Sequence, residues 1–242
     1  MNSFLAEFKE DFYINFIKED RWQFLTTGLS NTLKITLGSL ILGILIGVMV
    51  AIVRSSYDKT YKEMKSGVGK IFLGFFNMIC KLYLTVIRGT PVVVQLMIMY
   101  YIIFASSRNS LMVAILAFGI NSGAYVAEII RSGIMSIDQG QFEAGRSLGF
   151  NYVQTMTHII IPQAFKNVLP ALANEFIVLL KETSVAGYVT IRDLTMGGDI
   201  IRAATFTAFL PLFAVAIIYL IMVMFFTWLV GILERRLRKS ER

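Results

Sequence analysis

The sequence contains 242 residues, of which 56% are hydrophobic and 16% are charged, and its mean hydropathy is +0.66. Soluble domains carry about 25% charged residues, so this composition excludes an ordinary soluble domain and indicates a membrane protein. The net charge of +7 does not predict nucleic-acid binding, because the basic residues gather beside the ends of apolar segments, where they orient membrane proteins. A single cysteine and a single histidine exclude an internal disulfide and do not suffice for a zinc site.

Residues 1–24 form a charged segment ahead of the first apolar stretch, with three basic and five acidic side chains. Phe4, Phe8, Phe12 and Phe16 recur every four residues, a spacing that predicts an external or interfacial amphipathic helix. A frayed leader without regular structure fits the same residues equally well. The segment lacks the pattern of a cleaved secretory signal, so we expect the first apolar span to direct insertion.

Five segments are apolar over a length that can cross a bilayer, which requires about 20 residues of helix. Three of them contain 19 residues without a charge, and the last contains 31. The fourth is interrupted by Lys166, Glu175 and Lys181, so we expect its helix to hide part of its surface from lipid. The predicted spans cover residues 35–53, 89–107, 109–127, 159 onwards and 203–233.

Two of these spans carry glycines four residues apart. Gly43 and Gly47 lie on the first span, and Gly119 and Gly123 lie on the third. Small residues at this spacing permit close contact between membrane helices. Chance occurrence in a glycine-rich span is the simpler interpretation, and the pattern names no particular partner.

Basic residues set the expected orientation of the spans. Residues 54–82 carry six basic and two acidic side chains, and residues 234–242 carry five and two, so both segments are expected in the cytosol. We interpret residues 71–87 as an interfacial helix, because a further crossing would move a basic loop outside. The predicted fold is therefore all-α: a polytopic membrane protein with five transmembrane helices in residues 25–234, an external N-terminus and a basic cytosolic tail at 235–242.

A polar loop at about residues 135–162 lies between two apolar regions and is predicted to be cytosolic. Asp138 can cap the start of a helix, with Gln141 three residues later, and Gly149 can close its end. These signals predict a short helix over residues 139–148. Its position in the cytosol makes it a candidate docking element.

The predicted loop helix has few large side chains on one face. Ala144, Gly145 and Leu148 would leave this face lightly covered and partly apolar, so that a partner can approach the backbone closely. Asn151 is expected to cap a second helix, and Pro162 to kink or stop the helix that follows. On composition alone, a solvated loop helix without a partner is the simpler interpretation.

No grouping of side chains predicts catalysis. His158 is the only imidazole, and no nucleophile, base and orienting group stand at a spacing that the sequence can defend. Gly67, Gly69 and Lys70 share only part of a phosphate-binding loop, because its first glycine is missing and Ile71 replaces the Ser or Thr that would meet magnesium. Any ATP-driven activity must therefore come from another polypeptide.

The polar loop matches a known pattern. It reads EAGRSLG over residues 143–149 and, after nine further residues, IIIP over residues 159–162. This resembles the EAA loop of ABC-importer membrane subunits, although Gly145 replaces the usual second alanine, which should loosen the helix by about 1 kcal/mol. Ile161 replaces a leucine without obvious consequence. The ATPase-coupling residues that the resemblance implies are Glu143, Ala144, Gly145, Gly149, Ile159, Ile161 and Pro162.

The resemblance extends over nearly the whole chain from Gly28 to Leu233. It is carried by GLSNTLKIT at 28–36, RGTP at 88–91, NSGAYVAEIIRSGI at 121–134, GQFEAGRSLG at 140–149 and KETS at 181–184. These segments are similar to the polar amino-acid permeases of the histidine, glutamine and arginine uptake type.

The resemblance implies a multi-pass subunit of a bacterial cytoplasmic membrane importer. Its implied partners are two cytosolic ABC ATPases, a second permease subunit that is identical or related, and an external amino-acid-binding protein. The chain itself is then no enzyme and holds no cofactor, since ATP and magnesium belong to the ATPase. An ion-coupled secondary transporter that acts without an ATPase is the alternative, and a membrane hydrolase or transferase is a weaker one.

Polar residues of the third and fourth spans are candidates for the solute path. Intramembrane ionisable groups cost about 3 kcal/mol by insertion scales, so they tend to face a protein interior or a watery cavity. A zwitterionic amino acid needs both donors and acceptors there. Glu128 could instead pair with Arg131, and Lys181 could extend towards the membrane surface. The candidates are Asn121, Ser122, Tyr125, Glu128, Glu175, Lys181, Glu182, Thr183 and Ser184.

Overall fold

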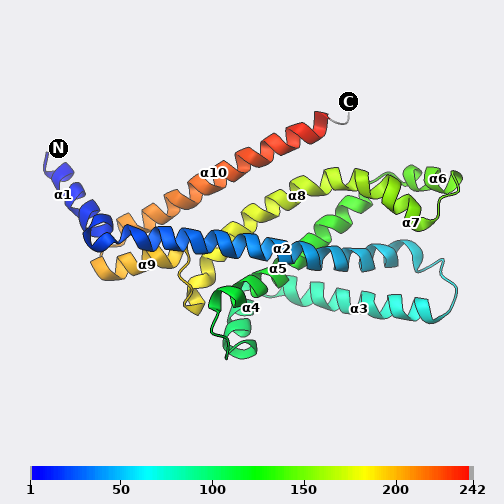
Figure 1. Cartoon of the computed structure of the whole chain (residues 1–242), viewed down its shortest axis with the longest axis horizontal. Coiled ribbons are helices and arrows are strands. Elements are labelled where there is room, and N and C mark those ends of the chain that lie inside the picture. Colours follow the sequence, from blue (N-terminus) through cyan, green and yellow to red (C-terminus); the bar gives the residue numbers. More distant parts are fainter. Residues whose placement is uncertain (1, 240–242) are drawn as a thin grey trace. The chain divides into compact units, whose positions relative to one another are not determined.

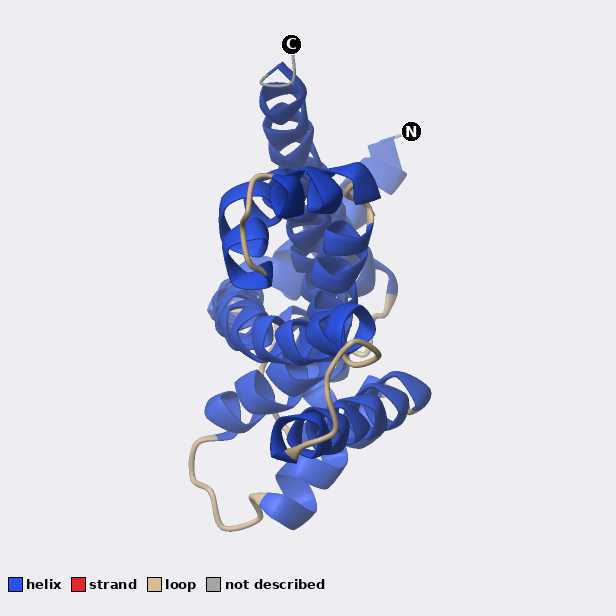
Figure 2. Ribbon diagram, turned by 90° about the vertical axis from the view of Figure 1, so that its right-hand side faces the viewer, coloured by secondary structure: helices blue, strands red, loops and turns tan. Residues whose placement is uncertain are grey.

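The computed structural model describes residues 2–239, and all regular structure in that range is helical (Figures 1 and 2). This confirms the predicted all-α class. The last three residues of the basic tail expected at 235–242 lie outside the described residues. The elements are α1 (Asn2–Phe12), η1 (Tyr13–Ile17), η2 (Lys18–Asp20), α2 (Trp22–Thr60), α3 (Val68–Gly89), α4 (Val92–Ile98), η3 (Met99–Ile103), α5 (Ser110–Met135), α6 (Gln139–Ser147), α7 (Tyr152–Thr155), η4 (Met156–Ile160), α8 (Ile161–Glu182), η5 (Thr183–Val189), α9 (Leu194–Thr205) and α10 (Phe209–Lys239).

The helices divide into two compact units, each assembled from segments far apart in the sequence. The first unit contains Met1–Ser39, Val92–Phe118 and Ile177–Trp228. The second contains Leu40–Pro91, Gly119–Phe176 and Leu229–Arg242. The helices α2, α5, α8 and α10 contribute residues to both units.

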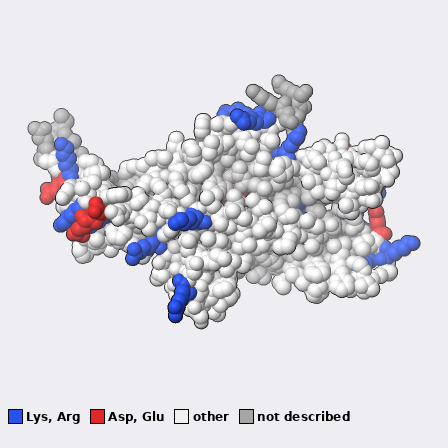
Figure 3. Space-filling model, viewed as in Figure 1, with Lys and Arg blue, Asp and Glu red and all other residues white. Residues whose placement is uncertain are grey.

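Four of the described helices are long and apolar enough to cross a membrane: α2, α3, α5 and α10. The expected span at 35–53 lies wholly within α2, and the one at 109–127 matches α5 except for its first residue. Of the span expected at 203–233, α10 contains residues 209–233. Exposed apolar side chains cover α10, as lipid contact requires: Leu220 and Ile221 are 58% and 60% exposed. Most of the face drawn in Figure 3 carries no charged side chain.

The second predicted span does not survive as a crossing helix. Residues 89–107 form only the seven-residue α4 and the five-residue η3, too short to span about 30 Å of hydrocarbon at 1.5 Å per residue. Residues 71–87, which we interpreted as interfacial, lie instead in the 22-residue α3, whose length and hydropathy suffice for crossing. From hydropathy alone, we placed the boundaries of these segments at basic residues. In the structure the helix instead breaks at the Thr90–Pro91 turn.

In the second unit, α2 and α5 approach closely through the glycines that the sequence singled out. A Cβ on Gly47 would lie 2.5 Å from a methyl carbon of Val126, and a Cβ on Gly119 would lie 2.6 Å from a methyl carbon of Leu42. Each helix thus offers its glycines to the larger side chains of the other. The close contact that the spacing permits is therefore present, although chance was the favoured interpretation of the sequence, and its partner is the other glycine-bearing helix.

The helix α3 packs on the same pair of helices. Val50 of α2, Cys80 of α3 and Ala127 of α5 form one buried cluster. The Tyr83 hydroxyl donates a hydrogen bond to the carbonyl oxygen of Ile120 at 2.6 Å. Within the second unit, α3 is therefore held by apolar packing on α2 and by a polar contact to α5.

In the first unit, α9 lies against the first turns of α2. The backbone N–H of Leu194 donates to the Thr32 hydroxyl oxygen at 3.1 Å, and the Asn31 amide donates to the carbonyl oxygen of Arg192 at 2.9 Å. A Cβ on Gly28 would stand 2.5 Å from the carbonyl oxygen of Asp193. The two backbones therefore touch at a glycine.

The N-terminal aromatic stripe is not one uniform face. Phe8 and Phe12 are exposed, whereas Phe16 is buried in a core cluster of the first unit. The side chain of Phe4 lies outside the described residues. Asn15 ties this segment to the end of α9, since its side-chain oxygen accepts from the hydroxyl of Thr205 at 2.9 Å.

The contact at Gly28 leads to a stability prediction. We expect Gly28→Ala to lower the free energy of unfolding by about 1–3 kcal/mol, because the added methyl group meets backbone atoms that cannot rotate away. Thermal unfolding of the purified chain in detergent measures the change.

The matched control is Gly231→Ala in α10, where a Cβ would meet nothing within 4 Å. Alanine favours the helix there, so this variant should be neutral or more stable. Equal unfolding temperatures for the two variants would contradict the close approach.

Candidate functional site

Two polar features of the second unit stand out against its apolar helices. One is the pair of short helices α6 and α7, in the loop between α5 and α8. The other is a cavity lined by residues of α3, α5 and α8. Both depend on side chains that local sequence signals place.

The helix α6 begins and ends where its capping residues predict. The Asp138 carboxylate accepts from the backbone N–H of Gly140 at 2.6 Å. At the other end, Gly149 has φ +81°, a left-handed conformation that glycine adopts without steric cost. Phe150 N–H donates to the carbonyl oxygen of Gly145 at 3.1 Å, and Gly149 N–H to that of Arg146 at 2.9 Å. This Schellman motif closes the helix.

The helix α7 also starts at its predicted cap, and it packs on α6. Asn151 and Gln154 form a reciprocal capping box. Gly145 is buried, and a Cβ there would lie 2.7 Å from the Thr155 methyl carbon. The expectation that Gly145 leaves an open face for a partner is therefore wrong, because α7 occupies that face. Ala144 and Leu148 remain exposed.

Pro162 does not stop the helix. The chain runs through the π-helical turn η4 directly into α8, and Ile161 keeps helical angles of φ −59° and ψ −43°. Proline removes one backbone donor, and the wider π turn lies where the α-helical pattern would be interrupted. Pro162 and Ile161 are exposed and Ile159 is half-buried, whereas Ile160 is fully buried in a cluster with Ile134 and Ala164.

The end of α2 reaches the loop helix. Lys59 places its ammonium 4.3 Å from the centre of the Phe142 ring, and Arg146 lies 3.4 Å from the carboxylate of Glu63. A small hollow of about 160 Å³ opens between these groups. Tyr152 also lines the hollow, and burial raises the pKa of its phenol above the ordinary value.

The cavity beside α5 has a volume of about 580 Å³, within the range of small-molecule sites. Buried Glu175 of α8 closes one side, and its carboxylate accepts a hydrogen bond from the Ser122 hydroxyl at 2.8 Å. Asn167 donates to the Ser136 hydroxyl at 3.0 Å. The lining residues are Arg88, Tyr125, Glu128, Ile129, Ser132, Gly133, Ser136, Asn167, Ala171 and Glu175.

Glu128 of the cavity wall is paired with two guanidinium groups. Glu128 accepts from Arg131 at 2.7 Å, and Arg88 approaches Glu128 at 3.9 Å. Arg88 also lies over the Tyr125 ring at 5.7 Å. The proposed pairing of Glu128 with Arg131 is confirmed, so this carboxylate has a structural role as well as a place on the cavity wall.

The structure brings together only part of the predicted solute path. Ser122 and Glu175 are bonded to each other, and Tyr125, Glu128 and Glu175 line the cavity. Asn121 is buried but is not among the lining residues. Residues 181–184 belong to the first unit, where the buried Thr183 hydroxyl donates to the carbonyl oxygen of Leu180 at 2.8 Å.

Sequence reasoning missed several lining residues. The sequence singles out Arg88 only as the first residue of the RGTP motif, which by itself assigns it no place on a cavity wall. Ser132, Ser136 and Asn167 had no signal, because polar residues at helical spacing are common on exposed faces. They become cavity residues only through the packing of α5 and α8.

Comparison with known proteins identifies the family. Residues 67–239 match the family described as binding-protein-dependent transport system inner membrane component. The chain belongs to this family. The match covers α3 to α10 and therefore both polar features of the second unit.

Relatives of this inner membrane component are amino-acid permeases by name. The arginine transport system permease protein of Bacillus subtilis (strain 168) is 35% identical, covering 90% of this chain and 94% of the relative. The glutamine transport system permease protein of Escherichia coli (strain K12) is 34% identical over 85% and 90%. The expected family is thus confirmed.

Solved structures agree in fold. An amino acid ABC transporter crystallised with histidines is 39% identical, with a TM-score of 0.78 over 88% of this chain and 94% of that one. An inward-facing methionine ABC transporter reaches a TM-score of 0.72 over 90% and 98% at 18% identity, which supports the fold alone.

The closing turn of α6 leads to a prediction about local stability. We expect Gly149→Val to speed amide hydrogen exchange of residues 139–147 about tenfold, because a β-branched side chain disfavours the left-handed conformation by roughly 1–2 kcal/mol. Exchange measured by mass spectrometry in detergent tests this.

Gly149→Asn is the matched control, since asparagine tolerates the left-handed region. Its exchange rates should stay close to those of the unaltered chain. Equal rates in the Val and Asn variants would show that the Gly149 conformation does not hold the end of α6.

Proposed function

We propose that this chain is the membrane permease subunit of an ATP-driven importer for polar amino acids. The observation that carries the proposal is the cavity of the second unit, which combines a guanidinium with two carboxylates. The family membership and the names of the relatives supply the transport class. The capped helix α6 supplies a compact element by which an ATPase can act on the membrane subunit.

The cavity suits a zwitterion. The Glu175 carboxylate can accept from an α-ammonium group while keeping its bond to Ser122, because a carboxylate has about four acceptor positions. The Arg88 guanidinium has five N–H donors in a fork that matches a carboxylate, and its contact with Glu128 at 3.9 Å is long. Ser132, Ser136 and Asn167 offer neutral donors and acceptors to a polar side chain.

The loop of α6 and α7 provides the proposed coupling contact. In this assignment Glu143 to Gly149 form a coupling helix seated on a cytosolic ABC ATPase, with Ile159 in η4 and with Ile161 and Pro162 at the start of α8. The exposed faces of Ala144 and Leu148 are available for that contact. ATP and magnesium bind to the ATPase, so this chain is not itself the enzyme.

The proposed topology has five spans, α2, α3, α5, α8 and α10, with the N-terminus outside and the C-terminus in the cytosol. Taking α3 as a span and α4 with η3 as an external segment preserves the predicted number of crossings. It also keeps Lys59, Lys62, Lys65 and Lys70 inside, as the positive-inside rule requires. Residues 1–24 are then external or interfacial, and 235–242 form the cytosolic tail.

The complete assembly would contain two permease subunits, identical or related, two ATPases and an external amino-acid-binding protein in a bacterial cytoplasmic membrane. The alternative, an ion-coupled transporter acting alone, gains no support from relatives that are named permease proteins of transport systems. The residues that line the cavity do not support a hydrolase or transferase, because they form no recognisable catalytic grouping.

Uptake by reconstituted vesicles tests the proposal. We expect uptake of L-arginine or L-glutamine only when the permease, the ATPase, ATP and the binding protein are present together. Radiolabel inside the vesicles is the measurement. Uptake by this chain alone under a proton or sodium gradient would sink the ATP-driven assignment.

The variant Gly149→Pro tests the docking role of the coupling helix. Proline is expected to disrupt the end of α6 while the apolar helices still insert. The variant should therefore enter the membrane but lose co-purification with the ATPase. Unchanged co-purification would remove α6 from the docking contact.

The cavity assignment predicts a specific effect of Glu175→Gln. This variant keeps an oxygen for the Ser122 hydrogen bond but loses the negative charge, so we expect the half-saturating amino-acid concentration to rise about tenfold or more. Concentration-dependent uptake by the complete assembly is the measurement.

The control is Asp199→Asn, which removes an exposed carboxylate paired with Arg202 on α9. It should leave the half-saturating concentration unchanged. If the two variants behave alike, Glu175 does not meet the solute.

A further inference from the structure

The end of α2 contacts three other elements of the second unit. Arg54 donates to the Asn77 side chain of α3 at 2.7 Å. One turn later, Asp58 lies 3.5 Å from Arg131 of α5, and Lys59 lies over the ring of Phe142 in α6. The start of α8 also contacts the loop helix, since the Gln163 amide donates to the Gln141 side chain at 3.2 Å.

A continuous series of charged contacts leads from the cavity to this helix end. Arg88 and Glu128 line the cavity and lie 3.9 Å apart. Glu128 accepts from Arg131 at 2.7 Å, and Arg131 reaches the Asp58 carboxylate at 3.5 Å. Arg131 therefore bridges a carboxylate of the cavity wall and a carboxylate of α2.

Asp58 and Lys59 are consecutive residues on one helix. Successive residues of an α-helix point about 100° apart, so Asp58 can face α5 while Lys59 faces α6. Because both belong to the same helical turn, a displacement of Asp58 moves Lys59 as well. The ring of Phe142 lies in the middle of α6, so that movement would reach the loop helix directly.

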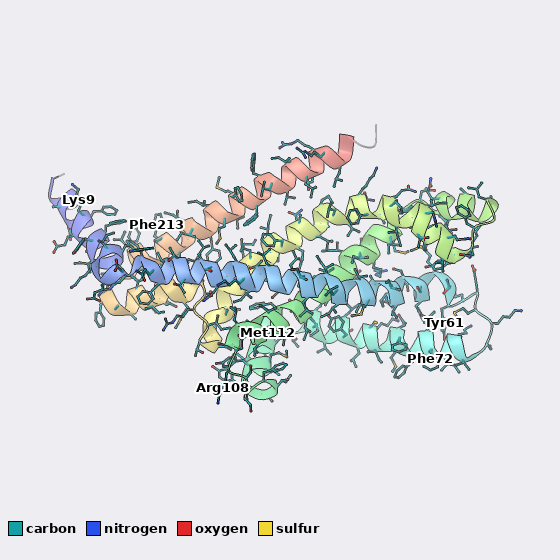
Figure 4. The ribbon with its side chains drawn as sticks, viewed as in Figure 1. Lys9, Tyr61, Phe72, Arg108, Met112 and Phe213 are labelled. Atoms are coloured by element: carbon teal, nitrogen blue, oxygen red, sulfur yellow. The ribbon has the colours of Figure 1, made fainter. Side chains whose placement is uncertain are left out.

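A second contact follows in the connection between α2 and α3. Glu63 pairs with Arg146 at 3.4 Å, although both side chains are more than two-thirds exposed. Figure 4 labels Tyr61 and Phe72 on this connection and the start of α3, and Lys70 lies 5.0 Å from the Tyr61 ring centre. The connection is thus organised around the same end of α2, and α6 is held at Phe142 and at Arg146.

We propose that Asp58 and Lys59 are positioning residues that transmit the state of the solute cavity to the coupling helix α6. The inference rests on the proposed function of the cavity and of α6, and it adds the route between them. When solute engages Arg88 or Glu128, the Glu128–Arg131 pair shifts, Asp58 follows Arg131, and Lys59 changes its hold on Phe142. A coupling measurement tests this route.

Two properties make these residues testable without unfolding the protein. The Arg131 and Asp58 side chains are 28% and 29% exposed, so solvent can replace part of what each contact supplies. The apolar cluster of Val50, Cys80 and Ala127 holds the helices together independently. Single substitutions are therefore expected to change coupling while the chain still folds and inserts.

The first test measures α6 itself, in the complete chain in lipid nanodiscs. We expect Lys59→Ala and Asp58→Asn to speed hydrogen–deuterium exchange of residues 139–147 about threefold, the loss expected for an exposed cation–π contact. Lys59→Arg keeps a cation over the ring and should restore the slow exchange. Lys62→Ala removes the same charge from the same segment and should have no effect.

The second test measures coupling in the reconstituted complex with its ATPase and binding protein. The readout is the ratio of ATP hydrolysis with and without L-arginine or L-glutamine on the binding protein. Lys59→Ala and Asp58→Asn should lower this ratio about threefold, whereas Lys62→Ala and Lys59→Arg should not. Co-purified ATPase should stay constant in all four variants.

The outcomes separate this inference from the proposed function. Unchanged α6 exchange in Lys59→Ala, or an equal effect of Lys62→Ala, overturns the positioning role whatever the transport activity. Loss of co-purified ATPase in Lys59→Ala also overturns it, since Lys59 would then be a docking residue. An unaltered complex that imports neither amino acid defeats the proposed function, while the exchange experiment still decides whether Asp58 and Lys59 hold α6.

Discussion

The close approach of α2 and α5 is the constraint on which the rest of the second unit depends. Gly47 and Gly119 bring the two helices so near that a single methyl group on either would meet the side chain opposite. With the helices at this separation, α3 can pack on both, and its last turn brings Arg88 to the cavity wall. The same arrangement places Asp58 beside Arg131. The cavity and the contacts of the loop helix therefore both depend on the close approach of α2 and α5.

In the loop between α5 and α8, local sequence sets the ends of the helices, whereas packing sets which faces are buried. The Asp138 cap, the left-handed Gly149 and the Asn151 capping box are properties of short sequences, and each was predictable. Which face of α6 is buried was not predictable, because that depends on how α7 packs against it. Gly145, expected to face a partner, instead lets Thr155 approach, which explains why glycine is tolerated where the related pattern has alanine.

For the polar groups of the cavity, the sequence indicated candidates and the structure identified their partners. Intramembrane carboxylates are costly unless they are paired or hydrated, so Glu128 and Glu175 stood out in the sequence as candidates for a solute path. Their actual partners, Arg131 and Ser122, give them structural roles as well. The lysine and glutamate at 181 and 182, which looked similar by composition, belong to the other unit. Spacing along the chain could not separate these cases.

The sequence by itself determined the membrane class, the helical fold and the caps of α6 and α7, because these follow from composition, periodicity and short-range hydrogen bonding. The resemblance of its motifs indicated the family. Only the tertiary structure decided that α3 is long enough to cross while α4 and η3 are too short. It also decided that Ser132, Ser136 and Asn167 face a cavity and that the end of α2 meets α6. These features depend on contacts between residues tens of positions apart, which no local pattern encodes.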